Sequence, residues 1–225
     1  MKTAYFTLSN PKFDSERTNV GFEKCWATYQ IPILPAYAIA SYTIQGLKVT
    51  DDGDVSAINS SIMGEVVKVE GLNQLTHMLG PEESTLIINY LGIKDYKCFF
   101  PQFENDDLKC RAAEFMEEAD KTFDEGSWLS FVLMAGGVLE SFLVDITDDK
   151  QSTFGNLIKQ IEQKHLFSKE EIGVLRDASK ARNLVHAGKF KKPYVSRGVA
   201  MSVRLTLEQM LRKDWHSIKT KNTHE

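Results

Sequence analysis

The chain has 225 residues, of which 42% are hydrophobic and 26% are charged. This is the composition of an ordinary globular protein, and it excludes collagen-like, coiled-coil and disordered chains. The net charge is −4, yet residues 176–221 hold 12 Lys and Arg against 3 Asp and Glu, which leaves +9 on that stretch. Such a basic stretch is typical either of a surface that faces a polyanion or of solvated helix faces that dock on the acidic remainder.

The three cysteines lie far apart and form no Cys-x-x-Cys pair. This spacing predicts neither a zinc site nor a disulfide framework, and it favours the reducing conditions of the cytoplasm. Residues 1–8 lack the long apolar stretch of a signal peptide. We expect no metal and no cofactor, because the sequence contains no Gly-rich phosphate loop and no cluster of His, Cys and Asp with metal-ligand spacing.

The first hundred residues mix strand and helix signals. Runs of β-branched and aromatic residues predict strands at 4–8, 37–49, 62–69 and 96–100. Helices are expected at 72–79 and 81–91, because Pro81 suits a first helical turn and two glutamates follow it. The two helices have the length of a helix-turn-helix, but the second has no Arg or Lys for contacts with DNA. No motif in this region indicates a substrate or a partner.

The composition changes near residue 101, where a polar, turn-like segment begins. We therefore expect an α+β protein, with a mixed α/β domain over 1–103, an all-α bundle over 104–215 and a polar tail over 216–225. Apolar spacing and capping residues predict five helices, at 106–124, 127–146, 152–164, 168–188 and 195–211. The glycine pair at 136–137 indicates the close approach of another helix, since glycine otherwise weakens a helix interior.

The helix expected at 127–146 is almost wholly apolar between Trp128 and Leu139. A membrane span needs about 20 apolar residues, and Glu140 interrupts this run, so we expect a buried core helix and no membrane contact. A buried carboxylate is costly unless it is paired. Arg182 and Arg176 are the natural partners of Glu140, either in a plain salt bridge or in a pair that supports a functional site.

Residues 180–188 form the motif with the clearest chemistry. On a helix, Arg182 and His186 lie at i and i+4, one turn apart on the same face. Arg can bind phosphate with two hydrogen bonds and stabilise charge as it develops, and His can transfer a proton near neutral pH. Asn183 can position either group. This set of side chains is typical of a site that acts on a phosphodiester.

An Arg-Asn pair followed shortly by His, late in a helix of a small bundle, resembles the signature of the HEPN superfamily. A second segment, residues 135–143 (AGGVLESFL), is similar to the Ala-Gly…Leu-Glu…Leu helix of one HEPN subgroup. The order of the helices also matches, and the resemblance covers about half of the chain. Three residues separate Arg182 from His186, about one fewer than in the usual Arg-Asn-x-x-x-His, which turns the histidine by about 100° around the helix.

The resemblance implies a metal-independent ribonuclease or an RNA-binding effector, of the kind found in bacterial defence and toxin systems. In the enzyme, Arg182 would hold the phosphate, His186 would transfer the proton and Asn183 would orient them, in a site shared across a homodimer. Glu140 and Arg176 would support this site. The alternative is a non-catalytic dimerisation or protein-interaction module, in which Arg182 and His186 are structural.

Basic residues surround the motif, and an aromatic residue, Tyr194, follows it. The basic residues are Lys180, Lys189, Lys191, Lys192 and Arg197. Basic side chains beside an aromatic ring can follow a phosphate backbone, so we predict RNA binding here. A solvated loop is the alternative interpretation of the same residues.

Overall fold

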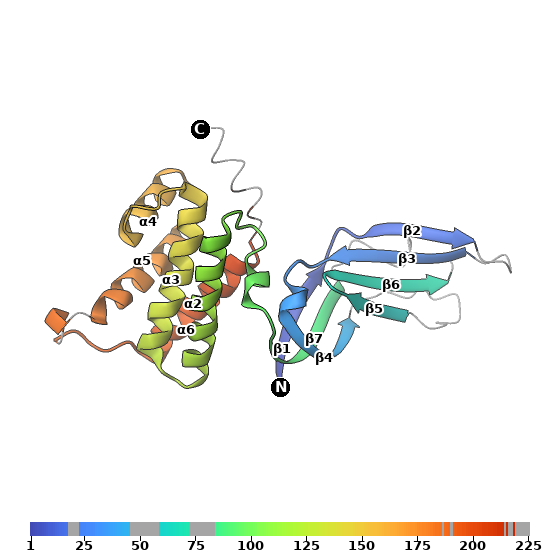
Figure 1. Cartoon of the computed structure of the whole chain (residues 1–225), viewed down its shortest axis with the longest axis horizontal. Helices are drawn as coiled ribbons and strands as arrows, with labels where there is room; N and C mark the ends of the chain where they lie inside the picture. The colour runs from blue at the N-terminus through green and yellow to red at the C-terminus, as the bar shows by residue number, and fades with distance from the viewer. Residues whose placement is uncertain are drawn as a thin grey trace. The chain divides into compact units, whose positions relative to one another are not determined.

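The computed structural model describes residues 1–17, 23–45, 59–72, 84–185, 187–189, 191–213, 215 and 218. The chain divides into two compact units, Met1–Cys98 and Phe99–Glu225, which we call the strand unit and the helical unit (Figure 1). The fold class is α+β, as predicted. The division falls a few residues before the expected one at 103.

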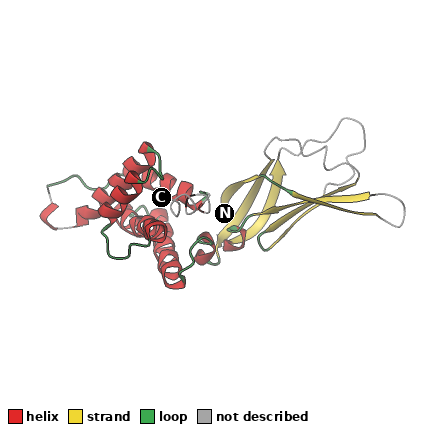
Figure 2. Ribbon diagram, turned by 90° about the horizontal axis from the view of Figure 1, so that it is seen from above, coloured by secondary structure: helices red, strands yellow, loops and turns green. Residues whose placement is uncertain are grey.

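The strand unit contains two antiparallel sheets, drawn in yellow in Figure 2. The first sheet has the order β1-β7-β4, and its strands are β1 (Lys2–Leu8), β4 (Tyr37–Gln45) and β7 (Ser84–Ile93). Alternate residues of β1 are buried, and so are alternate residues of β7, with Phe6 opposite Leu86 in the register. The period of two in these apolar residues therefore gives the sheet one buried face.

The second sheet has the order β2-β3-β6-β5. Its strands are β2 (Lys12–Arg17), β3 (Glu23–Gln30), β5 (Asn59–Met63) and β6 (Val66–Leu72). The β5–β6 turn contains Gly64 at φ +60, a backbone conformation that suits glycine. The Tyr42 hydroxyl of β4 donates to the carbonyl oxygen of Ser60 of β5 at 2.6 Å, so it connects the two sheets.

Several sequence predictions for this unit are wrong. The helix expected at 81–91 is strand β7 in its described part, because Ser84, Leu86 and Ile88 are buried on one face at a spacing of two. The strand expected at 96–100 is a 3-10 helix, η2 (Tyr96–Phe99), which the Asp95 carboxylate caps through the backbone N–H of Lys97. The strand expected at 62–69 is divided by the β5–β6 turn. The helix expected at 72–79 lies almost entirely outside the described residues.

The helical unit contains the five predicted helices. They are α2 (Asp106–Asp124), α3 (Trp128–Thr147), α4 (Phe154–Gln163), α5 (Lys169–Arg182) and α6 (Arg197–Leu211). Helix α3 lies at the centre of the bundle and contacts the other four (Figure 1). Among the described helices, α3 alone is long and apolar enough to cross a membrane, but 61% of its most apolar window is buried inside the protein.

The close helix approach predicted at the glycine pair is present between α2 and α3. A Cβ atom on Gly137 would lie 2.7 Å from the Cδ2 atom of Phe115, which is closer than real Cβ contacts allow. Glycine at 137 therefore makes room for the Phe115 ring. Gly136 faces a different neighbour, the Cδ atom of Arg182 at 3.6 Å.

An aromatic cluster explains why the residues just after 98 belong to the helical unit. The ring of Phe142 in α3 stacks on Trp215 at 4.7 Å between centroids. Phe100, from the expected strand at 96–100, and Phe103, from the expected polar segment after it, pack against the same Phe142 ring at 5.6 and 5.2 Å. Both are buried, so burial of these rings holds the linker segment against the bundle.

Candidate functional site

The end of helix α5 positions the candidate motif. The helix begins with the predicted capping box, in which Ser168 and Glu171 exchange hydrogen bonds of 3.2 and 2.8 Å. It ends at Arg182, six residues before the end that the sequence predicted, and continues as the 3-10 helix η3 (Asn183–Val185). The α-helical spacing assumed between Arg182 and position 186 therefore does not hold. His186 itself lies outside the described residues.

Arg182 forms the ion pair with Glu140 that the sequence predicted. Its Nη1 atom donates to the Oε2 atom of Glu140 in the middle of α3. The arginine stem passes α3 at Gly136, one turn before Glu140, where a Cβ atom would make ordinary van der Waals contact with it at 3.6 Å. The side chains of Arg182 and Glu140 are 39% and 26% exposed, so the pair is only partly removed from water.

A cavity of about 530 Å³ opens beside this ion pair, and we call it the Arg182 cavity. Leu133 and Phe154 supply an apolar wall. The remaining lining residues carry polar groups or come from the first turn of α4, and they are Glu140, Thr153, Gly155, Ser179, Arg182 and Asn183. An apolar wall with a few polar groups is the usual composition of a small-molecule site.

A second cavity of about 440 Å³, the lysine cavity, lies next to the first. It is lined by Lys180, Asn183, Leu184, Lys189 and Lys192. Asn183 lines both cavities, so they adjoin at this residue. Three lysine residues thus line one hollow, and the ammonium of one of them, Lys180, is paired with Asp177.

The basic stretch of the sequence separates into paired and unpaired charges. Five of its members form ion pairs, namely Arg176 with Glu162, Lys180 with Asp177, Arg182 with Glu140, Arg204 with Asp120 and Glu208, and Lys213 with Glu171. Arg176, the second partner considered for Glu140, is thus held by α4 instead. Within the described part of the chain, Lys189, Lys192 and Arg197 form no ion pair and are exposed. The unpaired positive charge gathers after α5.

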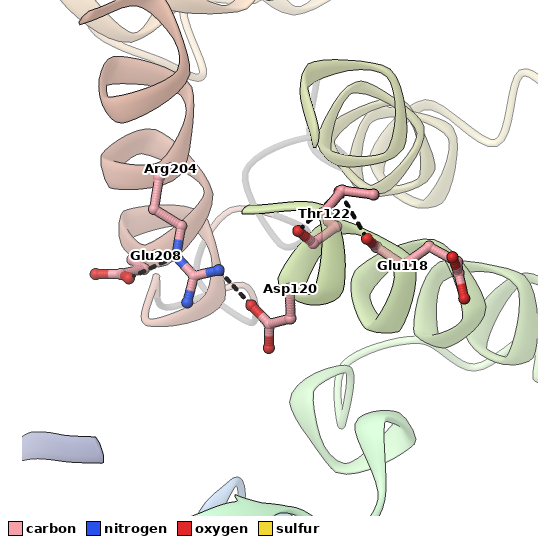
Figure 3. A network of polar contacts seen from close by, with 6 residues as sticks. Glu118, Asp120, Thr122, Arg204 and Glu208 are labelled. Carbon is pink, nitrogen blue, oxygen red and sulfur yellow. Dashed lines mark hydrogen bonds and ion pairs between the residues drawn. The ribbon is translucent and has the colours of Figure 1, made fainter. Parts of the chain in front are cut away.

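Arg204 occupies the most buried of these ion pairs, which sequence analysis did not predict. Figure 3 shows its guanidinium between Asp120 of α2 and Glu208, one turn further along α6. The side chains of Arg204 and Asp120 are 22% and 12% exposed. Burial opposes the charge of Arg204, but the adjacent carboxylates of Asp120 and Glu208 raise its pKa above the usual value. This arginine therefore connects α2 and α6 by ion pairs and lines neither cavity.

The remaining predicted RNA-binding residues lie in the segment that leads to α6. Lys191 is exposed but does not line either cavity. Tyr194 is 73% exposed, and Arg197 is the first residue of α6. The structure therefore brings Lys180, Lys189 and Lys192 together at one hollow.

The chain matches no protein-family model, and no characterised protein and no solved structure is significantly similar to it. Among the described residues, no three His, Cys, Asp or Glu side chains are grouped so that they could hold a metal ion. The two adjoining cavities at the end of α5 are therefore the basis on which a function can be proposed.

Proposed function

We propose that the helical unit is a HEPN-like domain that binds RNA at the end of α5. The observation that carries the proposal is the lysine cavity, which adjoins the Arg182 cavity through Asn183. Lys189 and Lys192 neutralise backbone phosphates, and Arg182 lines the neighbouring hollow. The exposed ring of Tyr194, two residues after Lys192, offers a surface on which an unpaired base can stack.

In the enzymatic form of this proposal, the protein is a cytoplasmic endoribonuclease of a bacterial defence or toxin system, including antiviral defence. The 2′-oxygen of a ribose loses its proton to His186 and attacks the adjacent phosphorus, which forms a 2′,3′-cyclic phosphate and breaks the bond to the 5′-oxygen of the next nucleotide. The departing 5′-oxygen takes a proton from water. Arg182 stabilises the charge on the phosphate oxygens, and Asn183 orients the reacting groups. A homodimer formed through the helical unit completes the site. No metal takes part in this scheme, because the ribose supplies the nucleophile.

RNA binding is tested by the anisotropy of a labelled single-stranded RNA of ten nucleotides, titrated with the full chain at several salt concentrations. The Lys189→Ala/Lys192→Ala variant should bind at least tenfold more weakly. Each phosphate contact on a single strand contributes about 0.7 to the slope of log K against log salt, so two lost contacts lower the slope by about 1.4. The matched control is Lys159→Ala/Lys169→Ala, which removes two exposed lysines that line neither cavity and form no ion pair with a described residue. Equal binding by both variants and the wild type would exclude the lysine cavity as the RNA site.

Cleavage is tested separately by incubating mixed RNA with the wild type and with His186→Ala in excess chelator. We expect cleavage by the wild type and loss of at least a hundredfold in the variant, since general acid–base catalysis contributes about 10²–10⁴-fold. Binding without cleavage would leave an RNA-binding effector. Cleavage that persists in His186→Ala would assign the reaction to other residues.

A second candidate function is a non-catalytic interaction module, and the Glu140–Arg182 ion pair favours it because Arg182 already has a partner. Helix α6 also exposes Met201 and Leu205, one turn apart, at 47% and 58%. Under this proposal Met201→Lys/Leu205→Lys abolishes self-association or partner binding in sedimentation velocity, whereas the lysine-cavity variant leaves it unchanged. RNA binding that is weakened by Lys189→Ala/Lys192→Ala and unchanged by Met201→Lys/Leu205→Lys favours the first proposal.

A further inference from the structure

The Arg182 cavity differs in charge from the lysine cavity beside it. Glu140 and Arg182 face it as a pair with no net charge, and Ser179 and Asn183 add neutral polar groups. A phosphate in this cavity would meet the Glu140 carboxylate, whereas the described lining of the lysine cavity consists of three lysines, Asn183 and Leu184 and includes no carboxylate. The Arg182 cavity therefore suits a neutral, planar group that offers hydrogen-bond donors.

We infer that the Arg182 cavity binds the base of the nucleotide whose phosphate occupies the lysine cavity, and that Glu140 selects guanine. The inference rests on the proposed RNA binding and adds the base that is recognised. Asn183 lines both hollows, so the base and the phosphate of one nucleotide can occupy them together. Leu133 and Phe154 provide the apolar wall for the face of the base.

The carboxylate of Glu140 determines the selectivity. Its Oε2 atom accepts one hydrogen bond from Arg182, and a carboxylate has about four acceptor positions, so Oε1 and the second lone pair of Oε2 can accept from a base. Guanine presents two adjacent donors, N1–H and the 2-amino group, which match two carboxylate oxygens. Uracil presents one N–H between two carbonyl oxygens, which the carboxylate repels. A well-placed pair of this kind gives roughly tenfold discrimination or more.

The experiment compares two labelled ten-nucleotide RNAs, oligouridine and the same strand with one central guanosine. Both carry 2′-fluoro groups, which prevent cleavage, and the anisotropy is measured with the full chain. We expect the guanosine strand to bind about tenfold more tightly. In Glu140→Gln the amide keeps its size and its acceptor for Arg182 but offers donors to uracil carbonyls, so the difference between the strands should fall to about twofold or less.

A steric variant tests the location of the base. Gly155 lines the Arg182 cavity, whereas Gly173 of α5 lines neither cavity. At both glycines nothing lies within 4 Å of the Cβ position. Gly155→Leu should remove the guanosine preference, whereas Gly173→Leu should retain it. Circular dichroism and melting temperature establish that both variants fold.

The outcomes separate the inference from the proposed function. Equal binding of the two strands by the wild type overturns base recognition but leaves RNA binding intact. Equal weakening of both strands in Glu140→Gln also overturns it, because Glu140 then acts only by holding Arg182. A guanosine preference that survives both Glu140→Gln and Gly155→Leu assigns the base to another surface. Failure of both strands to bind overturns the proposed function itself.

Discussion

Arg182 and Glu140, 42 positions apart in the sequence, form an ion pair that joins the last residue of α5 to the middle of α3. The pair lies at the point where the chain leaves the helix for the 3-10 turns after it. It also places a carboxylate at the wall of the Arg182 cavity. The stability of the bundle and the chemistry of the cavity therefore depend on the same two side chains.

The energy of this pair can be measured by a double-mutant cycle with Glu140→Ala and Arg182→Ala. Exposed pairs contribute about 0–1 kcal/mol, whereas breaking a fully buried pair costs about 3–5 kcal/mol. The side chains here are 26% and 39% exposed, so we expect a coupling of about 1 kcal/mol in the free energy of unfolding, measured in urea. Additive effects of the two substitutions would mean that the side chains are not coupled.

Gly137→Ala should destabilise the protein. The new Cβ would lie 2.7 Å from the Phe115 ring, and overpacking of this kind costs about 1–3 kcal/mol. The matched control is Gly173→Ala in α5, where nothing lies within 4 Å of the Cβ position, so its helix propensity should stabilise the protein by about 0.5–1 kcal/mol. Melting temperatures that shift in opposite directions support the contact, and equal shifts contradict it.

Asp120→Ala should cost more than Glu208→Ala, although both remove a carboxylate from Arg204. Asp120 is 12% exposed and Glu208 is 42% exposed. Loss of Asp120 leaves a largely buried guanidinium short of a partner, at about 2 kcal/mol. Loss of the i,i+4 partner costs about 0.5 kcal/mol. Chemical denaturation of the two variants measures the difference in the free energy of unfolding. Equal losses would show that the burial of the carboxylate does not determine the size of the effect.

Stability should fall in acid through Asp149. Hydrogen bonds from Ser152 and Gln160 lower the pKa of this carboxyl from 3.8 to about 2. Because the folded-state pKa is the lower one, the contribution of Asp149 is complete above about pH 4 and is lost as the pH falls toward 2.

The comparison is between the wild type and Asp149→Asn, unfolded in urea from pH 6 to pH 2. The stability difference between them should shrink across the window between pH 4 and pH 2. The control is Asp148→Asn, because Asp148 is exposed and accepts no hydrogen bond from a described residue. A difference that stays constant with pH would contradict the assignment.

The helical unit could be predicted from the sequence because its signals are local. Helix α2 begins and ends where apolar spacing predicted, and the predicted Ser168–Glu171 capping box is present. The Glu140–Arg182 pair was also predictable, since a carboxylate in an apolar helix requires a partner. The early end of α5 was not predictable, because Leu184 and Val185 continue the apolar spacing beyond the last helical residue.

The strand unit was predicted less well because its pairing is non-local. Strand β7 lies between β1 and β4, and no short window of sequence reports its partners. The β-branched run Thr85–Ile88 held the correct signal, but Pro81 and two glutamates just before it favoured a helix start. Charge counts likewise could not distinguish lysines that form ion pairs from the unpaired Lys189 and Lys192, because ion pairing depends on how the helices pack.

The central position of α3 has a consequence for how the helical unit unfolds. Since α3 contacts each of the four other described helices of the unit, none of them can detach without exposing part of its surface. Its backbone amides should therefore exchange hydrogen only through global opening, whereas those of the short turns after Arg182 should exchange through local opening. The segment that carries the candidate site can then rearrange around a ligand at little cost to the cooperativity of the bundle.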